Sequence, residues 1–299
     1  MLSLGLEHLQ GELLMPKNKK IGLILPGGGF HGPFQAGVLK FFEERGIRFD
    51  YIVASSIGTI NASILGAKDG DAEKLCKFWE NVKPHHFFYL AWKEWLKTGH
   101  INSIFSPKKL EEQILKIADI YNQRENMDIE LSLLNLDTGR VEYVSSHDPD
   151  FKNALWASTA IAPFYPAMFL ESRGSQYIDG GLGRNFMIQR CFEKGCDSVV
   201  LINLIETQKT RAKPQKEFGK RRSLEAVFWR TATLVIKRVF ADSAGQDKYD
   251  NEKVLKIFSP KGTYFSILLP SNRWFRQMIE TGYEEAERVF NASMLLVGK

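Results

Sequence analysis

A serine near the start of the chain stands in a pattern that could make it a nucleophile. Ser56 follows the apolar, β-branched stretch 49–53 and precedes a stretch of small residues, so a strand should turn sharply into a helix there. A nucleophile elbow of this kind lifts a serine hydroxyl above the edge of a sheet. It requires small residues two positions before and two positions after the serine, where Ala54 and Gly58 stand. The A-x-S-x-G pattern is common, so its meaning depends on what lies near it.

A glycine-rich segment precedes this elbow by one predicted helix. The apolar run 21–25 predicts a buried strand, and Gly27, Gly28 and Gly29 lie between it and a predicted helix over 34–45. Three consecutive glycines at a helix N-terminus expose backbone N–H groups where the helix dipole also favours negative charge. They could therefore form an oxyanion hole beside a serine on the next parallel strand.

The same loop also allows a nucleotide site. Gly27, Gly29 and Gly32 form the G-x-G-x-x-G fingerprint of dinucleotide-binding folds. That fingerprint expects an acid near the end of the second strand, but Asp50 stands at the start of the predicted strand over 51–53. Because the ribose position is then unfilled, a nucleotide- or lipid-binding module without catalysis is kept as the alternative interpretation.

A serine nucleophile needs a base, and the order of the histidines excludes the usual α/β-hydrolase arrangement around the best acid. That arrangement places serine, acid and histidine in this order along the chain. All six histidines, of which His147 is the last, precede Asp179, an acid that ends a predicted strand before Gly180 and Gly181. A two-residue site remains, in which Asp179 takes the proton of Ser56 directly.

The composition is that of an ordinary globular protein, with 299 residues, 25% of them charged and 44% hydrophobic. The net charge of +5 is mild, and we expect no nucleic-acid partner. Three cysteines without a C-x-x-C pair favour reduced thiols and provide no zinc spacing. We see no signal peptide and no apolar run long enough to span a bilayer, so we expect a cytoplasmic protein that at most lies on a membrane surface.

Short apolar runs alternate with amphipathic stretches, which is typical of an α/β fold with a mostly parallel sheet. Further strands are predicted over 129–135, 141–145, 198–204 and 254–258. A helix is predicted from Ser106, as its N-cap, to about residue 120. We divide the chain into an N-terminal arm (1–19), a catalytic core (20–205) and a C-terminal helical region that completes or caps the same domain (206–299).

Two segments could contact a membrane. The stretch 87–95 is rich in tryptophan, tyrosine and phenylalanine, and tryptophan and tyrosine favour membrane interfaces. It could equally be a segment packed on the core. The predicted helix within 221–240 carries basic residues at its flanks and could lie on anionic lipid, or form a core helix with a solvated basic edge.

Four motifs together resemble those of the patatin-like phospholipases. That family carries a G-G-G-x-[RK]-G loop, a G-x-S-x-G elbow, an A-S-x-A-x-P loop and a D-G-[GA] turn, and the corresponding segments here are 27–32, 54–58, 157–163 and 179–181. The resemblance covers about residues 20–205. It implies a three-layer α/β/α fold and a dyad of Ser56 and Asp179 that hydrolyses phospholipids or other lipid esters without a metal or cofactor.

The sequence departs from the family pattern in three places. His31 stands where the family usually has arginine or lysine, Ala54 replaces the first glycine of the elbow, and one extra residue precedes Pro163. None of these departures removes a group with a chemical role. We expect them to affect efficiency and substrate preference more than the class of reaction.

Overall fold

The computed structural model describes residues 19–162, 164–183, 185–204, 253–259 and 270–297. In this part of the chain, one eight-stranded sheet has the order β5-β6-β3-β2-β1-β7-β8, with β4 on the other edge of β3. The strands are β1 (Ile21–Leu25), β2 (Tyr51–Ala54), β3 (Asp128–Asn135), β4 (Val141–Ser145), β5 (Met168–Leu170), β6 (Ser175–Asp179), β7 (Ser198–Asn203) and β8 (Val254–Phe258). Strands β3, β2, β1, β7 and β8 run parallel, whereas β4, β5 and β6 pair in antiparallel fashion. The predicted mostly parallel sheet is confirmed.

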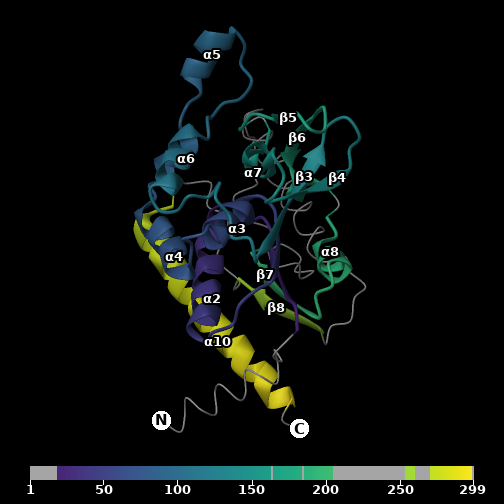
Figure 1. The fold of residues 1–299 in the computed structure, drawn as a ribbon. Helices are drawn as coiled ribbons and strands as arrows, with labels where there is room; N and C mark the ends of the chain where they lie inside the picture. Colours follow the sequence, from purple (N-terminus) through teal and green to yellow (C-terminus); the bar gives the residue numbers. More distant parts are fainter. Residues whose placement is uncertain (1–18, 163, 184, 205–252, 260–269, 298–299) are drawn as a thin grey trace, which may run out of the picture.

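Helices cover both faces of this sheet (Figure 1). The helices are α2 (Gly32–Glu44), α3 (Ile57–Gly66), α4 (Ala72–Asn81), α5 (Trp92–Thr98), α6 (Lys108–Leu115), α7 (Phe151–Thr159), α8 (Met187–Glu193) and α10 (Asn272–Val297). The 3₁₀ turns with described bounds are η1 (Gly29–His31), η2 (Pro84–Phe88) and η3 (Gly180–Leu182). None of the described helices is both long and apolar enough to cross a bilayer.

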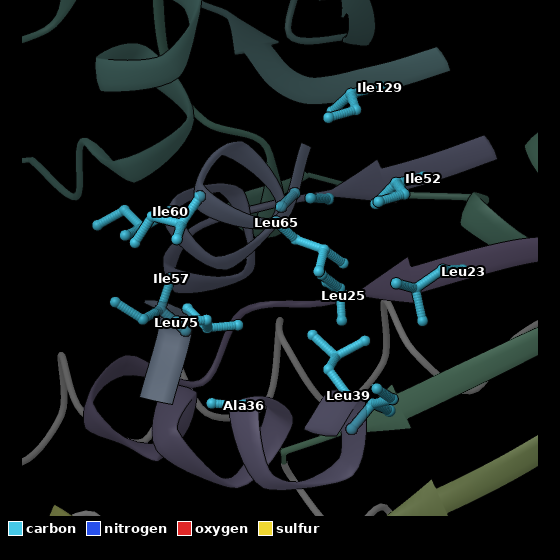
Figure 2. Packing of buried hydrophobic residues seen from close by; sticks show 14 of the residues in the cluster. Leu23, Leu25, Ala36, Leu39, Ile52, Ile57, Ile60, Leu65, Leu75 and Ile129 are labelled. Carbon is cyan, nitrogen blue, oxygen red and sulfur yellow. The ribbon is translucent and has the colours of Figure 1, made fainter. Parts of the chain in front are cut away.

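Successive side chains of the strands alternate between two cores. Leu23 and Leu25 of β1 point into the larger core, on the side where α2 and α3 lie in Figure 2. This core also contains residues of α4, α7 and α10. Ile24 points to the opposite face and packs with Met187 and Ile188 of α8. Because a strand buried on both faces needs apolar residues at every position, β1 reads as a continuous apolar run. The three-layer α/β/α fold is therefore confirmed.

The C-terminal helix α10 lies directly against α2. A Cβ atom at Gly37 would lie 1.9 Å from the carbonyl oxygen of Ile279, and one at Gly282 would lie 2.1 Å from that of Phe34. The two backbones therefore touch at this crossing, which only glycine allows. The division of the chain into arm, core and C-terminal region stays a prediction, and residues 1–18, the basic helix within 221–240 and Pro163 lie outside the described residues.

The helix predicted from Ser106 is shorter than expected. Pro107, not Ser106, is the N-cap of α6, and the helix ends at Leu115 instead of near residue 120. The N–H of Ile117 bonds back only three residues, to Ile114, and this tighter turn ends the helical ladder. The chain then folds inward and buries Ile120.

Candidate active site

Ser56 occupies the strained turn expected of an elbow. Its φ of 54° and ψ of −131° make it the only non-glycine residue with positive φ in the described part of the chain. Such a conformation costs about 1–3 kcal/mol and persists where the surrounding structure fixes it. Here β2 ends at Ala54, α3 begins at Ile57, and the N–H of Ser56 donates to the carbonyl oxygen of Ser158 at 2.8 Å.

The small residues around the serine behave as the elbow requires. A Cβ atom at Gly58 would lie 1.9 Å from the carbonyl oxygen of Leu25, so α3 meets the end of β1 with no space for a side chain. Ala54 is fully buried at the end of β2, where its methyl group is accommodated. The departure from glycine at this position therefore leaves the turn intact.

The register of the sheet brings Ser56 and Asp179 together. Strands β2 and β6 lie on the same edge of β3. Strand β4 must occupy the other edge, because it pairs with Leu131, which also pairs with β2, and with Leu133, which also pairs with β6. They run in opposite directions and end facing each other: Ala54 pairs with Leu131, and Asp179 pairs with Leu133. The gap between the two strand ends is one β3 residue wide, so the chain after Ala54 arrives beside Asp179.

The last turn of α7 and the residue that follows the helix hold both strand ends. The carbonyl oxygen of Ser158 accepts the N–H of Ser56, and that of Ala160 accepts the N–H of Asp179 at 3.0 Å. The Ser158 hydroxyl donates to the carbonyl oxygen of Ser132 at 3.0 Å and lies 2.7 Å from the Thr59 hydroxyl. The segment 157–163 was singled out as a family motif, but sequence reasoning missed this bracing, because the three acceptors named here are backbone carbonyls.

Asp179 is a fully buried carboxylic acid. One oxygen, Oδ1, accepts the N–H of Gly181 at 2.8 Å, while Oδ2 is buried without a hydrogen bond to any described residue. Burial raises the pKa of Asp179 to about 7, against the opposing effects of the Ser56 hydroxyl and the Gly181 N–H. The Ser56 hydroxyl is thus close enough to influence the carboxyl, although a closed hydrogen bond is not formed. Such catalytic contacts are often loose in the absence of substrate.

The glycine after Asp179 allows the close approach to β3. A Cβ atom at Gly180 would lie 2.4 Å from the carbonyl oxygen of Ser132. Gly181 supplies the N–H that Oδ1 of Asp179 accepts. The Asp-Gly-Gly turn therefore both brings the acid to β3 and fixes the orientation of its carboxyl group.

The carbonyl groups of the glycine loop are tied down from inside the core. Gln35 donates to the carbonyl oxygen of Pro26 at 3.0 Å, and Asn61 donates to that of Gly32 at 3.0 Å. Both side chains are fully buried, and Asn61 also donates to Gln35 at 2.8 Å. Polar residues on buried helices were the signal that could have revealed this network from the sequence.

His31 fixes the middle of the loop. Its backbone N–H and its ring Nδ1 lie 3.3 and 3.0 Å from the carbonyl oxygen of Gly28, so Nδ1 carries the proton of the second bond. Because the C=O and N–H of a trans peptide point in opposite directions, holding this oxygen sets the direction of the Gly29 N–H. The imidazole is buried and meets the Trp274 ring edge-on at 5.5 Å.

The N–H groups of the loop are left for another acceptor. Those of Gly27, Gly28 and Gly29 donate to no acceptor within the described ranges. Leu25 pairs with Ala54, so the loop that follows β1 lies next to the elbow that follows β2. The arrangement thus offers donors beside a serine hydroxyl.

The acid considered for a ribose lies elsewhere. Asp50 precedes β2 and accepts the N–H of Ile21 at 2.7 Å, at the start of β1. The glycine loop follows the other end of β1. Asp50 therefore has no part in this site, and the geometry favours an oxyanion hole over a dinucleotide loop.

The sequence model of the patatin-like phospholipase family matches residues 23–191. The chain belongs to this family. The matched region runs from β1 through the elbow and Asp179 to α8. It therefore contains all four of the motifs on which the resemblance was based.

Several curated patatin-like relatives are much longer proteins. The chain is 26% identical over 206 residues to the lysophospholipase nte1 of Aspergillus terreus, which covers 62% of this chain and 12% of that protein. It is 26% identical over 201 residues to the lysophospholipase NTE1 of Saccharomyces cerevisiae, with 62% and 11% covered, and 24% identical over 188 residues to the neuropathy target esterase sws of Drosophila melanogaster, with 62% and 13% covered. The chain thus matches about an eighth of the length of these relatives.

Two solved structures resemble the chain over most of its length. VipD from Legionella pneumophila has 15% sequence identity and a TM-score of 0.47, with 92% of this chain and 67% of that chain covered. The type III effector ExoU has 13% identity and a TM-score of 0.46, with 93% and 54% covered.

Proposed function

We propose that the protein is a serine acyl hydrolase that cleaves the ester bonds of phospholipids or other lipids. The observation that carries the proposal is that β2 and β6 meet on one edge of β3, with a strained serine after the end of β2 and a buried carboxyl group at the end of β6. Membership of the patatin-like phospholipase family supports a lipid ester as the substrate. Several relatives are named lysophospholipases, so lysophospholipids are the first substrates to test.

In the first half of the reaction, Ser56 Oγ attacks the ester carbonyl carbon while its proton passes to Asp179 Oδ2. Oδ2 suits this role because it has no other hydrogen-bond partner among the described residues, and a pKa of about 7 lets it accept and return a proton near neutral pH. The tetrahedral intermediate then collapses, the bond to the alcohol breaks, and the alcohol takes the proton from Asp179. An acyl group remains on Ser56.

In the second half, a water molecule replaces the alcohol. It attacks the acyl carbonyl carbon as Asp179 takes its proton, and the acyl–oxygen bond to Ser56 breaks. The serine oxygen then recovers the proton, and the fatty acid leaves. Asp179 thus accepts and returns one proton in each half of the reaction, so no third side chain is needed.

The glycine loop supplies the oxyanion hole in this proposal. The N–H groups of Gly27, Gly28 and Gly29 are the candidate donors, and the start of α3 adds the positive end of a helix dipole beside Ser56. Removing one such donor costs about 3–4 kcal/mol of transition-state stabilisation in comparable enzymes. The hydrogen bonds from Gln35, His31 and Asn61 to the loop carbonyls support this role, because they fix the donors before substrate arrives.

Labelling with a fluorophosphonate probe tests the proposal. The wild-type protein should be labelled at Ser56, Ser56→Ala should not be labelled, and Asp179→Asn should be labelled far more slowly. Ser55→Ala is the matched control, since it removes the neighbouring hydroxyl and should leave labelling unchanged. Hydrolysis of a soluble ester by Ser56→Ala at the wild-type rate would overturn the assignment.

A further inference from the structure

Exposed apolar side chains gather on one excursion of the chain, which runs from residue 83 to residue 108. Half of the eight strongly exposed large apolar residues in the described ranges lie within 90–101. We call these four the apolar tip: Leu90 (51% exposed), Trp92 (47%), Leu96 (77%) and Ile101 (75%). In Figure 1, α5 stands at the top and projects beyond α6, away from the sheet. Apolar groups concentrated in this way on a projecting element mark a contact surface.

The tip is held on a defined support. An antiparallel bridge pairs Leu90 with Phe105, and the N–H of Ala91 donates to the carbonyl oxygen of Ile104 at 3.1 Å. The indole N–H of Trp95 donates to the carbonyl oxygen of Ser103 at 2.8 Å. The two arms of the excursion are therefore tied together, and the exposure of the apolar tip is a property of the folded chain.

Basic residues accompany the tip. Lys93 and Lys97 of α5 are exposed, and the Lys93 ammonium lies over the Trp92 ring, 5.4 Å from its centroid. Lys83 and Lys108, at the two ends of the excursion, are also exposed. Apolar side chains flanked by exposed lysines match the chemistry of an anionic lipid surface, which offers acyl chains below a layer of negative charge.

The base of the excursion reaches both parts of the candidate site. The ring of Phe88 lies 5.8 Å from that of Phe30, which directly follows the glycine loop, and 5.3 Å from that of Phe105. Phe105 in turn donates its N–H to the carbonyl oxygen of Phe164 at 2.7 Å, in the loop that follows Ala160. Aromatic side chains thus connect the tip to the glycine loop and to the segment that holds Asp179.

The structure alters the prediction made for the stretch 87–95. Phe87 is buried against Phe30 at 5.1 Å and against Trp79 at 6.1 Å, so the start of the stretch belongs to the core. Its exposed large apolar residues are Leu90 and Trp92, and the most exposed ones of the tip, Leu96 and Ile101, lie beyond the stretch.

We propose that the apolar tip inserts into the surface of anionic lipid. The rings of Phe105, Phe88 and Phe30 at the base of the excursion would then guide an acyl chain from there to the glycine loop. This rests on the proposed function, since it assigns the route by which a lipid ester reaches Ser56. A second copy of the chain fits the tip less well. A two-fold contact through α5 would bring Lys93 and Lys97 close to their own copies, and α5 carries one acid, Glu94, beside these two lysines.

Vesicle flotation tests the insertion in a Ser56→Ala background, where the lipid stays intact. The probes are vesicles of phosphatidylcholine alone and of phosphatidylcholine mixed with phosphatidylglycerol. The double variant Leu96→Glu/Ile101→Glu should lose affinity about a hundredfold, or about tenfold for each side chain. Lys93→Gln/Lys97→Gln should lose about fivefold for each lysine on the mixed vesicles and little on phosphatidylcholine.

The matched control removes two exposed apolar side chains from other elements. Leu136→Glu/Phe169→Glu changes the charge equally at the β3–β4 turn and on β5, and should bind like the parent protein. A second readout uses Trp92 fluorescence, which brominated lipid should quench, with Trp92→Phe losing that part of the signal. This readout needs no charged substitution, so it decides the matter even if a glutamate variant misfolds.

The outcomes separate this inference from the proposed function. With Ser56 restored, the tip variants should hydrolyse a soluble short-chain ester at the parental rate and lose activity only on vesicles. Unchanged vesicle affinity in the tip double variant and unquenched Trp92 would overturn the inference, as would a dimer in solution that the tip variants dissociate. Absence of Ser56-dependent hydrolysis alongside tip-dependent vesicle binding would instead refute the proposed function alone.

Discussion

Replacing Asp179 with asparagine should stabilise the fold while it abolishes turnover. The carboxyl is fully buried, and burial raises its pKa from 3.8 to about 7. A shift of about three units corresponds to roughly 4 kcal/mol that the folded protein must supply to keep Asp179 ionised. Asparagine has nearly the same shape and retains an oxygen for the Gly181 N–H, but it carries no charge. The variant therefore avoids the loss of folding free energy that comes from burying an ionised carboxyl group, which the proposed mechanism requires.

The sign of the pH dependence follows from proton binding. Below about pH 4, both the folded and the unfolded wild-type chain hold the Asp179 proton, so this group contributes no penalty. Between about pH 4 and pH 7 the unfolded chain has lost the proton and the folded chain has kept it. Stability of the wild type therefore falls by about 1.4 kcal/mol per pH unit, and it is constant again above the folded pKa. The advantage of Asp179→Asn should grow over the same interval.

Urea and thermal unfolding of both proteins across this pH range measure the effect. At pH 8 we expect Asp179→Asn to be more stable by about 4 kcal/mol, or about 6 °C in melting temperature for a chain of this length. The control is Asp150→Asn. Hydrogen bonds from Ser172 lower the pKa of Asp150, so this substitution should destabilise the protein at neutral pH and lose its effect in acid.

The same pKa should appear in the kinetics. If Asp179 must be ionised to accept the proton of Ser56, kcat/KM of the wild type on a soluble ester rises about tenfold per pH unit up to a midpoint near 7. A stability difference between Asp179→Asn and wild type that is equal at pH 5 and pH 8 would refute the reasoning. So would a wild-type rate that is flat down to pH 5.

Two further substitutions test the supports of the site. Gly58→Ala should destabilise the protein by about 3 kcal/mol in urea unfolding, because its Cβ would lie 1.9 Å from the Leu25 carbonyl oxygen, whereas Ala54→Gly should cost no more than about 1 kcal/mol. His31→Phe should lower kcat on a soluble ester at least about tenfold with little change in KM, since the Gly28 carbonyl loses its side-chain donor. His31→Gln, which retains an N–H donor, should recover part of that rate; equal loss in both variants would assign His31 a packing role only.

The central strands and the elbow could be predicted because their signals are local. The apolar runs of β1 and β7, which are buried at every position but the first of β7, show directly in short stretches of sequence. The turn at Ser56 is marked by small residues on both sides. Asp179 was found by elimination, since it is an acid at a strand end and no histidine follows it.

The way these residues meet could not be predicted. The approach of Ser56 to Asp179 depends on the antiparallel pairing of β6 with β3, and no local pattern encodes that register. The contacts that hold the two strand ends come from the carbonyl oxygens of Ser158 and Ala160, and a backbone carbonyl has no signature in the sequence. Exposure of Leu96 and Ile101 likewise depends on what the tertiary fold leaves uncovered.

The least favourable local features of the described chain coincide at one point of the sheet. Ser56 adopts a backbone conformation that its side chain disfavours, and Asp179 keeps a carboxyl group where burial opposes its charge. Strands β2 and β6 end on either side of the β3 residue Ser132, and the carbonyl oxygens of Ser158 and Ala160 hold the backbones of Ser56 and Asp179 in place. A core selected for stability alone would relax the turn and replace the acid with a neutral residue. The end of α7 and the residue after it hold both unfavourable features in place, at a cost in stability. A serine activated by a carboxyl group whose pKa lies near neutral pH is the chemistry that this arrangement favours.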